Sequence, residues 1–200
     1  MQLLMALASP FVRKVRIVLR ETNQLGDVQE VNVNTTPIAS DPVVVAANPT
    51  GKIPALIRDD GPAIYDSRVI TRFLDARAKS NLYPENALWE VLTLEATADA
   101  IMDAAVLLIY EVRFRTPEAQ SGDWMTGQWA KVTRALDAFE NRWLSHLAGP
   151  LHMGQIGTGC ALGYLDFRHG TFDWRADHPG LAAWYGAFSS RPSMTEPAPR

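Results

Sequence analysis

The spacing of apolar residues changes character about two fifths of the way along the chain. Before residue 80, continuous or alternating apolar runs, which are typical of strands, occur at residues 3–8, 28–33, 53–57 and 63–65. Stretches with helical spacing follow the first and the last of these runs. The order βαβ followed by ββα predicts a four-stranded mixed sheet with helices on its faces.

The first predicted helix has a recognisable start. Ser9 is suited to the N-cap and Pro10 to the first helical position. The helical spacing of the residues that follow predicts an apolar face made of Val12, Val15 and Leu19. A second helix is expected at residues 67–79, whereas residues 34–52, rich in Pro, Asn and Thr, are expected to be mostly loop.

After a linker at residues 80–86, the apolar spacing is helical throughout. Apolar residues from Met125 to Leu147 recur every three or four positions, which predicts one apolar stripe on a single long helix. Further helices are expected at residues 88–114, 156–168 and 181–188, and the tail 191–200 is expected to lie on the surface. The sequence therefore predicts an α/β part followed by an all-α part.

Composition narrows the classes of function. The chain has 200 residues, of which 47% are hydrophobic and 20% charged, and this balance argues against disorder. Nineteen basic and 22 acidic residues give a net charge of −3, so nucleic acid is not expected as a partner. The single cysteine, Cys160, excludes an internal disulfide and suits a reducing cytoplasm. Neither a metal site nor a membrane-spanning segment is expected.

A group of glycines in the second part has a structural interpretation. Gly157, Gly159 and Gly163 resemble a dinucleotide fingerprint, but no strand precedes them, so we interpret these glycines as allowing close helix packing.

Three turns of the first part carry the candidate chemistry. Ser9-Pro10-Phe11-Val12 stands where a redox protein would have a C-x-x-C pair, so dithiol exchange is excluded, but a serine at a helix N-terminus can stabilise a thiolate. If the Ile53–Pro54 bond is cis, the backbone of Ile53 can pair with a peptide-like ligand.

Charged and polar residues complete this set. Lys52 can neutralise one carboxylate of such a ligand, Asp66 can hold an ammonium group, and Ser67 can bind a second carboxylate. A γ-glutamyl tripeptide thiol would need these groups together. Taken singly, each turn is more simply explained as a helix cap or a strand-edge proline, so only their convergence indicates function.

The chain resembles the cytosolic glutathione S-transferase family, and specifically its bacterial members. The resemblance is carried in order by residues 9–15, 48–54, 66–67, 98–104 and 163–168. It implies a thioredoxin-like domain at residues 1–79, the linker at 80–86 and a helical-bundle domain at 87–200. It also implies a cytoplasmic homodimer that uses glutathione as co-substrate, without a metal, in detoxification.

The resemblance also assigns roles to single residues. Ser9 would stabilise the glutathione thiolate. Asp99 would reach across the dimer to the γ-glutamyl group. The electrophile would contact the helix that carries Met102, Tyr110 and Arg113. The remaining glutathione contacts would be Phe11, Lys52, Ile53, Pro54, Asp66 and Ser67.

One position departs from the pattern of this family. The resemblance places a capping box at His152 and Gln155, at the start of the helix that carries residues 163–168. Gln155 can serve as the N3 partner, but histidine is a poor N-cap, so this helix start is expected to be weak.

Two classes of function remain open at this point. The first is a transferase that activates the glutathione thiolate for attack on a hydrophobic electrophile. The second is a glutathione-binding or protein-interaction module of the same fold with little or no turnover. A peroxide or disulfide reductase is less favoured because residue 9 is not a cysteine.

Overall fold

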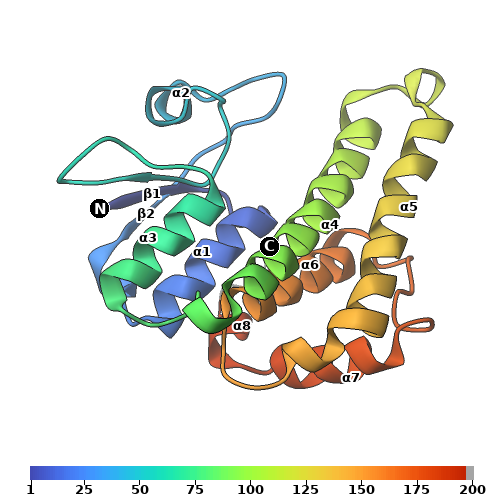
Figure 1. Cartoon of the computed structure of the whole chain (residues 1–200). Helices are drawn as coiled ribbons and strands as arrows, with labels where there is room; N and C mark the ends of the chain where they lie inside the picture. Colours follow the sequence, from blue (N-terminus) through green and yellow to red (C-terminus); the bar gives the residue numbers. More distant parts are fainter. Residues whose placement is uncertain (197–200) are drawn as a thin grey trace. The chain divides into compact units, whose positions relative to one another are not determined.

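A computed structural model describes residues 1–196 of the chain, and Figure 1 shows its elements. The chain divides into two compact units. The first unit contains Met1–Tyr83 together with the segment that begins at Pro192, and the second contains Pro84–Arg191. The division falls inside the expected linker, but residues 192–196 differ from the expectation because they pack with the first unit.

The sheet of the first unit has three strands rather than the expected four. Its order is β2-β1-β3, with β1 parallel to β2 and antiparallel to β3. A fourth strand is absent among the described residues, and a single bridge between Leu56 and Ile64 stands in its place. The strands are β1 (Gln2–Met5), β2 (Gln29–Asn32) and β3 (Ala55–Ile57).

Proline explains why this fourth strand stops at one bridge. Leu56 and Ile64 exchange two backbone hydrogen bonds of 2.9 Å. Continuing that antiparallel register would pair residue 58 with Pro62 and Pro54 with residue 66. Both pairs would need a backbone N–H from a proline, which has none, so the ladder cannot extend in either direction.

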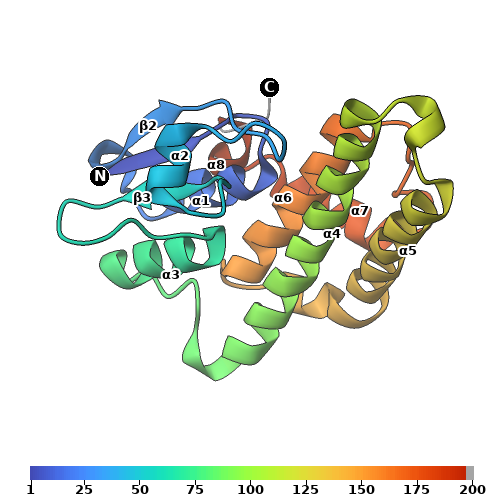
Figure 2. The same ribbon diagram turned by 90° about the horizontal axis from the view of Figure 1, so that it is seen from above.

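Helices cover both faces of the sheet. Figures 1 and 2 show α1 (Pro10–Glu21) and α3 (Ser67–Ala78) on one face and α2 (Pro42–Ala47) on the other. Helix α2 corrects the expectation of a mostly irregular segment. Its start carried a readable signal, since Asp41 caps it with a 2.9 Å bond from the amide of Val43 and Pro42 follows the cap.

The C-terminal segment 192–196, including α8 (Pro192–Thr195), packs on α1 within the first unit. Arg13 is only 7% exposed and donates from Nη2 to the carbonyl oxygen of Met194 at 2.9 Å. Arg20 pairs with Glu196 at 3.0 Å. The expected surface position of the tail is therefore wrong for Met194, which is buried, and residues 197–200 lie outside the described part.

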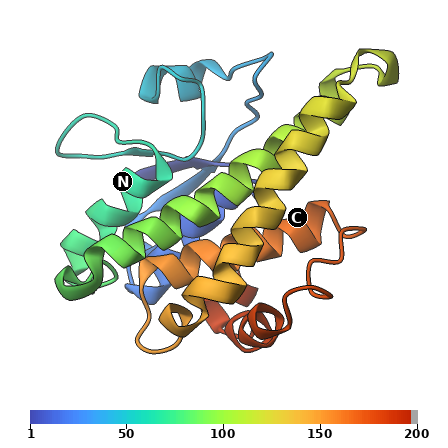
Figure 3. The ribbon, with the colours of Figure 1, turned by 45° about the vertical axis from the view of Figure 1, so that its right-hand side comes forward.

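The second unit is a helical bundle. Helix α4 (Leu88–Phe114) confirms the helix predicted at 88–114, and it packs along both α5 (Gly122–Ala138) and α6 (Met153–Arg168), as Figure 3 shows. Helix α7 (Pro179–Phe188) completes the bundle. Single 3₁₀ turns also occur, at Leu25–Asp27 in the first unit and at Glu85–Ala87 and Pro117–Ala119 in the second. No helix within residues 1–196 is both long and apolar enough to cross a membrane.

The single long helix expected from Met125 to Leu147 is wrong in its last third. Helix α5 ends at Ala138 and is followed by a π-helical turn, Phe139–Trp143, and a 3₁₀ turn, Leu144–Leu147. In the π turn, Glu140 accepts hydrogen bonds from the amides of Gly180 and Leu181 at 3.0 and 2.7 Å. The change of helix type thus accompanies a side-chain cap on the N-terminus of α7.

The start of α6 is better formed than expected. His152 Nδ1 accepts from the amide of Gln155 at 3.4 Å, and Gln155 Oε1 accepts from the amide of His152 at 2.9 Å, which completes a capping box. Gly157 allows close helix packing, as expected, because a Cβ there would lie 3.3 Å from Ala98 Cβ. Gly154, which does not belong to the predicted group, allows it as well, since a Cβ there would lie 2.8 Å from Leu94 Cβ.

Candidate glutathione site

Ser9 occupies the turn between β1 and α1. Its Oγ accepts a 3.3 Å hydrogen bond from the amide of Val12, so it is the N-cap of α1, as predicted. This bond uses an oxygen lone pair and leaves the hydroxyl hydrogen free to donate to a ligand. The first turn of α1 contains no acidic residue, so the positive end of the helix is not neutralised there.

The loop before β3 is shaped by one buried side chain. Asn48 donates from Nδ2 to the carbonyl oxygen of Lys52 at 2.8 Å, and its Oδ1 accepts from the amide and the hydroxyl of Thr50. Gly51 has a φ of +69°, and a Cβ there would lie 2.6 Å from Ser40 Oγ. The sequence motif Asn-Pro-Thr-Gly-Lys therefore specifies the shape of the loop. The role of Asn48 was not predicted, although an asparagine preceding a turn was an available signal.

This loop leads into a cis peptide bond between Ile53 and Pro54, which confirms the isomer considered from the sequence. Among the described residues, the backbone N–H and C=O of Ile53 make no hydrogen bond, and the exposed Lys52 has no acidic partner. The loop can therefore offer a donor, an acceptor and a cation to a ligand.

The third turn joins the bridge at Ile64 to α3. Asp66 follows a second cis bond, caps α3 by accepting from the amide of Arg68 at 3.0 Å, and pairs with the guanidinium of Arg68 at 2.8 Å. Burial raises the pKa of Asp66, but hydrogen bonds and charge from Arg68, with the charge of Lys14, outweigh burial and hold that pKa below its ordinary value. Ser67 is 3% exposed, and its hydroxyl has no partner among the described residues.

Strand register brings the three turns together at one end of the sheet. Leu4 pairs with Ala55, so the end of β1, which leads to Ser9, lies beside the start of β3, which follows Pro54. The bridge between Leu56 and Ile64 returns the chain to that same end just before Asp66. The structure therefore gathers the predicted residues of the first unit around one end of a three-stranded sheet.

The residues predicted on α4 have different environments. Asp99 is 8% exposed, and Met102 has no exposed surface. Met102 therefore belongs to the helical core, which corrects its expected place in an electrophile pocket. Tyr110 is partly exposed, and Arg113 is exposed with its guanidinium 5.3 Å from the ring centre of Phe114.

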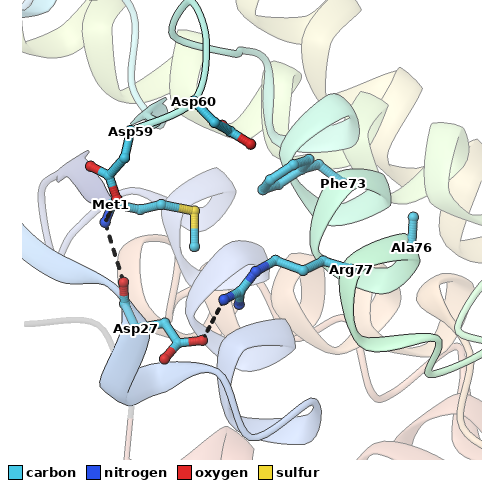
Figure 4. Close-up of a pocket in the computed structure, with 7 residues that line it drawn as sticks. All are labelled: Met1, Asp27, Asp59, Asp60, Phe73, Ala76 and Arg77. Carbon is cyan, nitrogen blue, oxygen red and sulfur yellow. Dashed lines mark hydrogen bonds and ion pairs between the residues drawn. The ribbon is translucent and has the colours of Figure 1, made fainter.

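A separate hollow in the first unit, drawn in Figure 4, has a volume of about 710 Å³. None of the residues predicted to bind glutathione lines it. The ammonium group of Met1 pairs with Asp59 at 3.2 Å, and Arg77 pairs with Asp27 at 2.7 Å, so its charges largely satisfy one another. Its lining residues are Met1, Asp27, Asp59, Asp60, Phe73, Ala76 and Arg77.

Residues 1–196 contain no cluster of three His, Cys, Asp or Glu side chains that could hold a metal ion. Among the described residues, the groups that the three turns offer to a ligand are hydrogen-bond donors, one lysine, one aspartate and a helix N-terminus.

Comparison with protein families and curated proteins gives two kinds of match. Residues 8–77 match the model of the glutathione S-transferase N-terminal domain, and residues 122–187 match that of the C-terminal domain. The uncharacterized GST-like protein YibF of Escherichia coli K12 is 31% identical over 204 residues, which cover 100% of this chain and 98% of YibF.

Solved structures resemble the chain over its whole length. A glutathione transferase family member from Pseudomonas fluorescens Pf-5, with bound glutathione, is 46% identical with a TM-score of 0.97, covering 100% of this chain and 98% of that one. A second structure from that organism, with bound S-(propanoic acid)-glutathione, is 45% identical with a TM-score of 0.92 and complete coverage of both chains. A glutathione S-transferase from Methylobacillus flagellatus KT with glutathione bound is 35% identical with a TM-score of 0.86, covering 100% and 99%.

Proposed function

The chain belongs to the glutathione S-transferase family, and from this premise we propose that it is a glutathione transferase that activates the thiol of glutathione for attack on an electrophile. The observation that carries the proposal is the convergence of three turns at one end of the sheet. Together they offer a hydroxyl donor, an unpaired backbone segment beside a lysine, and an aspartate beside a buried serine hydroxyl.

Each turn serves a different part of glutathione in this proposal. The hydroxyl of Ser9 donates to the sulfur, and Phe11 on the first turn of α1 contacts the tripeptide. The backbone of Ile53 before Pro54 pairs with the cysteinyl backbone. At the two ends of the tripeptide, Lys52 binds the glycyl carboxylate, and Asp66 and Ser67 bind the γ-glutamyl head group.

Ionisation of the thiol is the chemical task assigned to Ser9. A thiol with a pKa of about 8.5 is only about 3% ionised at pH 7. Lowering that pKa by about two units, worth about 2.7 kcal/mol, makes the thiolate the main form and raises its concentration roughly 20-fold. A hydrogen bond from Ser9 and the positive end of α1 both act in this direction. Positioning the two reactants must supply the rest of the acceleration.

The relatives support this chemistry. Two of the compared structures hold glutathione itself, and one holds glutathione whose sulfur carries a propanoic acid group. That last ligand has the form of a conjugate. From the same family likeness we propose a cytoplasmic homodimer in which Asp99 approaches the γ-glutamyl site of the partner subunit. Sedimentation of the wild-type protein would test the dimer. Calorimetry of glutathione binding to the wild-type protein and to Asp99→Asn would test the contact.

Titration of thiolate absorbance in the glutathione complex tests the role of Ser9. We expect Ser9→Ala to raise the apparent pKa of bound glutathione toward that of free glutathione. Ser121→Ala is a matched control, because Ser121 caps α5 with the same 3.3 Å bond but lies in the helical unit. Each variant should lose about 1 kcal/mol of stability through its cap. An unchanged thiol pKa in Ser9→Ala would remove Ser9 from the mechanism.

Turnover separates the two classes of function that the sequence leaves open. We expect both glutathione binding, measured by calorimetry, and conjugation of an aryl halide. Tight binding without turnover across a panel of electrophiles would instead identify a glutathione-binding module.

A further inference from the structure

A second hollow lies in the helical unit, where α5 gives way to the π turn that follows it. Its volume is about 430 Å³, within the range of small-molecule sites. Arg134 of α5 and Arg142 of the π turn line it, together with Asp137, Ala138 and Asn141. All five residues belong to the helical unit, and none of them is predicted to bind glutathione.

The π turn aligns the two arginines. Each residue of an α-helix advances about 100° around the axis, so positions 134 and 142 would differ by about 80° on a continuous α-helix. A π turn takes more residues for each revolution, because its hydrogen bonds span five residues instead of four. The rotation from Ala138 to Arg142 is therefore smaller than on an α-helix, and it brings Arg142 back toward the line of Arg134. Both side chains consequently border the same hollow.

The guanidinium groups of these two arginines are not neutralised by the chain. Arg134 and Arg142 are both exposed. Within residues 1–196, neither of them makes an ion pair, a hydrogen bond or a contact with an aromatic ring. The N–H donors of both guanidinium groups therefore remain available to an anion.

The neighbouring carboxylates are committed to the segment that contains the start of α7. Figure 1 shows this helix at the end of α5. Glu140 accepts from the amides of Gly180 and Leu181 at 3.0 and 2.7 Å. Oδ1 of Asp137 lies 3.0 Å from Nε2 of His178, a residue that is only 2% exposed. These bonds hold both acids away from the two arginines.

The hollow also offers hydrogen-bond acceptors. Oδ2 of Asp137 has no partner in the described part of the chain. Asn141 donates from Nδ2 to the carbonyl oxygen of Asp137 at 2.9 Å, which leaves its Oδ1 as an acceptor. A hydroxyl group can donate to either oxygen. The hollow therefore combines cationic donors with acceptors for hydroxyl groups.

We propose that this hollow binds a phosphate monoester of a small polyhydroxylated molecule. The phosphoryl group lies between the guanidinium groups of Arg134 and Arg142, and hydroxyl groups of the ligand donate to Asp137 and Asn141. This site is separate from the proposed transferase chemistry and does not depend on it.

The arrangement of the two arginines favours phosphate over carboxylate. Arg134 and Arg142 are separated by roughly 11 Å along the helix axis, so they approach an anion from two sides. A terminal phosphoryl group has three oxygens that can accept from both sides, whereas a carboxylate has two oxygens in one plane. The hollow is many times larger than the share of one water molecule in the liquid, about 30 Å³, so it has room for an organic body beside the phosphoryl group.

Calorimetry at constant ionic strength tests the proposal with ribose 5-phosphate and ribose, which share a sugar and differ by one phosphoryl group. Ribose 5-phosphate should bind more tightly than inorganic phosphate, and ribose alone should not bind measurably. Arg134→Gln and Arg142→Gln should each weaken the binding of ribose 5-phosphate by about tenfold or more, as loss of hydrogen bonds between charged groups predicts.

Arg168→Gln is the matched control, because Arg168 is another exposed arginine of the helical unit without an acidic partner among residues 1–196. It removes the same charge and should leave the affinity unchanged. Ala138→Leu keeps both charges but places a larger side chain in the hollow, so it should abolish the advantage of ribose 5-phosphate over inorganic phosphate. Gln and Leu are good helix formers and none of these positions is fully buried, so the variants should fold.

Four results would overturn the proposal or part of it. Ribose 5-phosphate that binds no more tightly than ribose would refute the phosphate site. An equal loss of affinity in Arg142→Gln and Arg168→Gln would show that net charge, not the hollow, governs binding. Tighter binding of succinate than of ribose 5-phosphate would replace the phosphate with a dicarboxylate. Equal affinities of the wild-type protein for ribose 5-phosphate and inorganic phosphate would refute the recognition of hydroxyl groups.

Discussion

The two units of the chain are specified by different kinds of residues. In the first unit, the proposed glutathione contacts come from three turns, and the residues that shape these turns are local. In the helical unit, α4 and α6 approach closely where Gly154 faces Leu94, which is 60 residues away in the sequence. A turn is specified by a few adjacent residues, whereas the approach of two helices depends on residues far apart in the chain. The first unit should therefore be damaged by changes to loops and the second by changes to helix packing.

The largest effect should come from Asn48→Ala. Asn48 is 2% exposed and its side chain makes three hydrogen bonds inside the loop before Ile53. We expect a loss of about 3 kcal/mol in the free energy of unfolding, because each bond contributes about 1 kcal/mol. Glutathione affinity should fall with it. Asn141→Ala is the control, since Asn141 makes one exposed hydrogen bond to the Asp137 carbonyl. Wild-type affinity in Asn48→Ala would show that the loop does not need its internal bonds.

Gly154→Ala should affect the helical unit instead. The new Cβ would lie 2.8 Å from Leu94 Cβ, so α4 and α6 must separate, at a cost of about 1–3 kcal/mol. Gly127→Ala adds the same methyl group to α5 where nothing lies within 4 Å, and there stability should rise by up to about 1 kcal/mol. Chemical denaturation would measure both. Equal effects of the two substitutions would mean that the close approach of α4 and α6 carries no energetic weight.

A smaller, pH-dependent effect is expected at His152. Its Nε2 lies 2.9 Å from the His146 carbonyl, so the proton sits on Nε2 and Nδ1 remains an acceptor for Gln155. Burial and the charge of His146 lower the pKa of His152, against the hydrogen bond to the His146 carbonyl. Because the pKa is lowered in the folded protein, the stabilisation that the His152 cap gives to α6 is complete at pH values above 6.5, the ordinary pKa of histidine. This stabilisation is lost as the pH falls below that value.

Urea titrations between pH 8 and pH 5 would measure this loss against His152→Ser, a cap that does not titrate. The difference should reach at most about 1 kcal/mol, the value of a cap. His169, whose pKa is also lowered by burial, is present in both proteins and cancels from the comparison. Parallel pH profiles for wild type and His152→Ser would show that protonation of this cap has no consequence.

The smallest effect concerns the interrupted ladder of the first unit. Pro62→Val restores the N–H that pairing with Arg58 requires, so one more backbone amide should become protected from hydrogen exchange, with stability changed by less than about 0.5 kcal/mol. An unprotected amide at residue 62 would mean that something other than the missing N–H ends the strand.

Sequence patterns predicted the parts of this molecule that depend on neighbouring residues. The cap at Ser9, the cap at Asp66 and the full extent of α4 were readable because their signals are local. Two features were not. The ladder at Ile64 stops because of prolines on two segments that meet only in the fold, and the π turn at Phe139–Trp143 accompanies a distant bond from Glu140 to α7.

The same difference separates the candidate site residues. The glutathione contacts proposed for the first unit could be named from motifs of a few residues. Met102 was expected in a pocket but lies in the core, because the phase of a helix relative to its neighbours decides which of its apolar residues meet solvent.

The contact between Arg13 and Met194 has a consequence for how the protein is made and divided. The guanidinium of Arg13 lies on α1, and its carbonyl acceptor is 181 residues further along the chain. Until Met194 has been synthesised, a cation destined for burial lacks this acceptor, so the first unit cannot be completed before the helical unit has left the ribosome. A fragment cut after Tyr83 would carry the same defect permanently, and supplying residues 192–196 as a separate peptide should repair it.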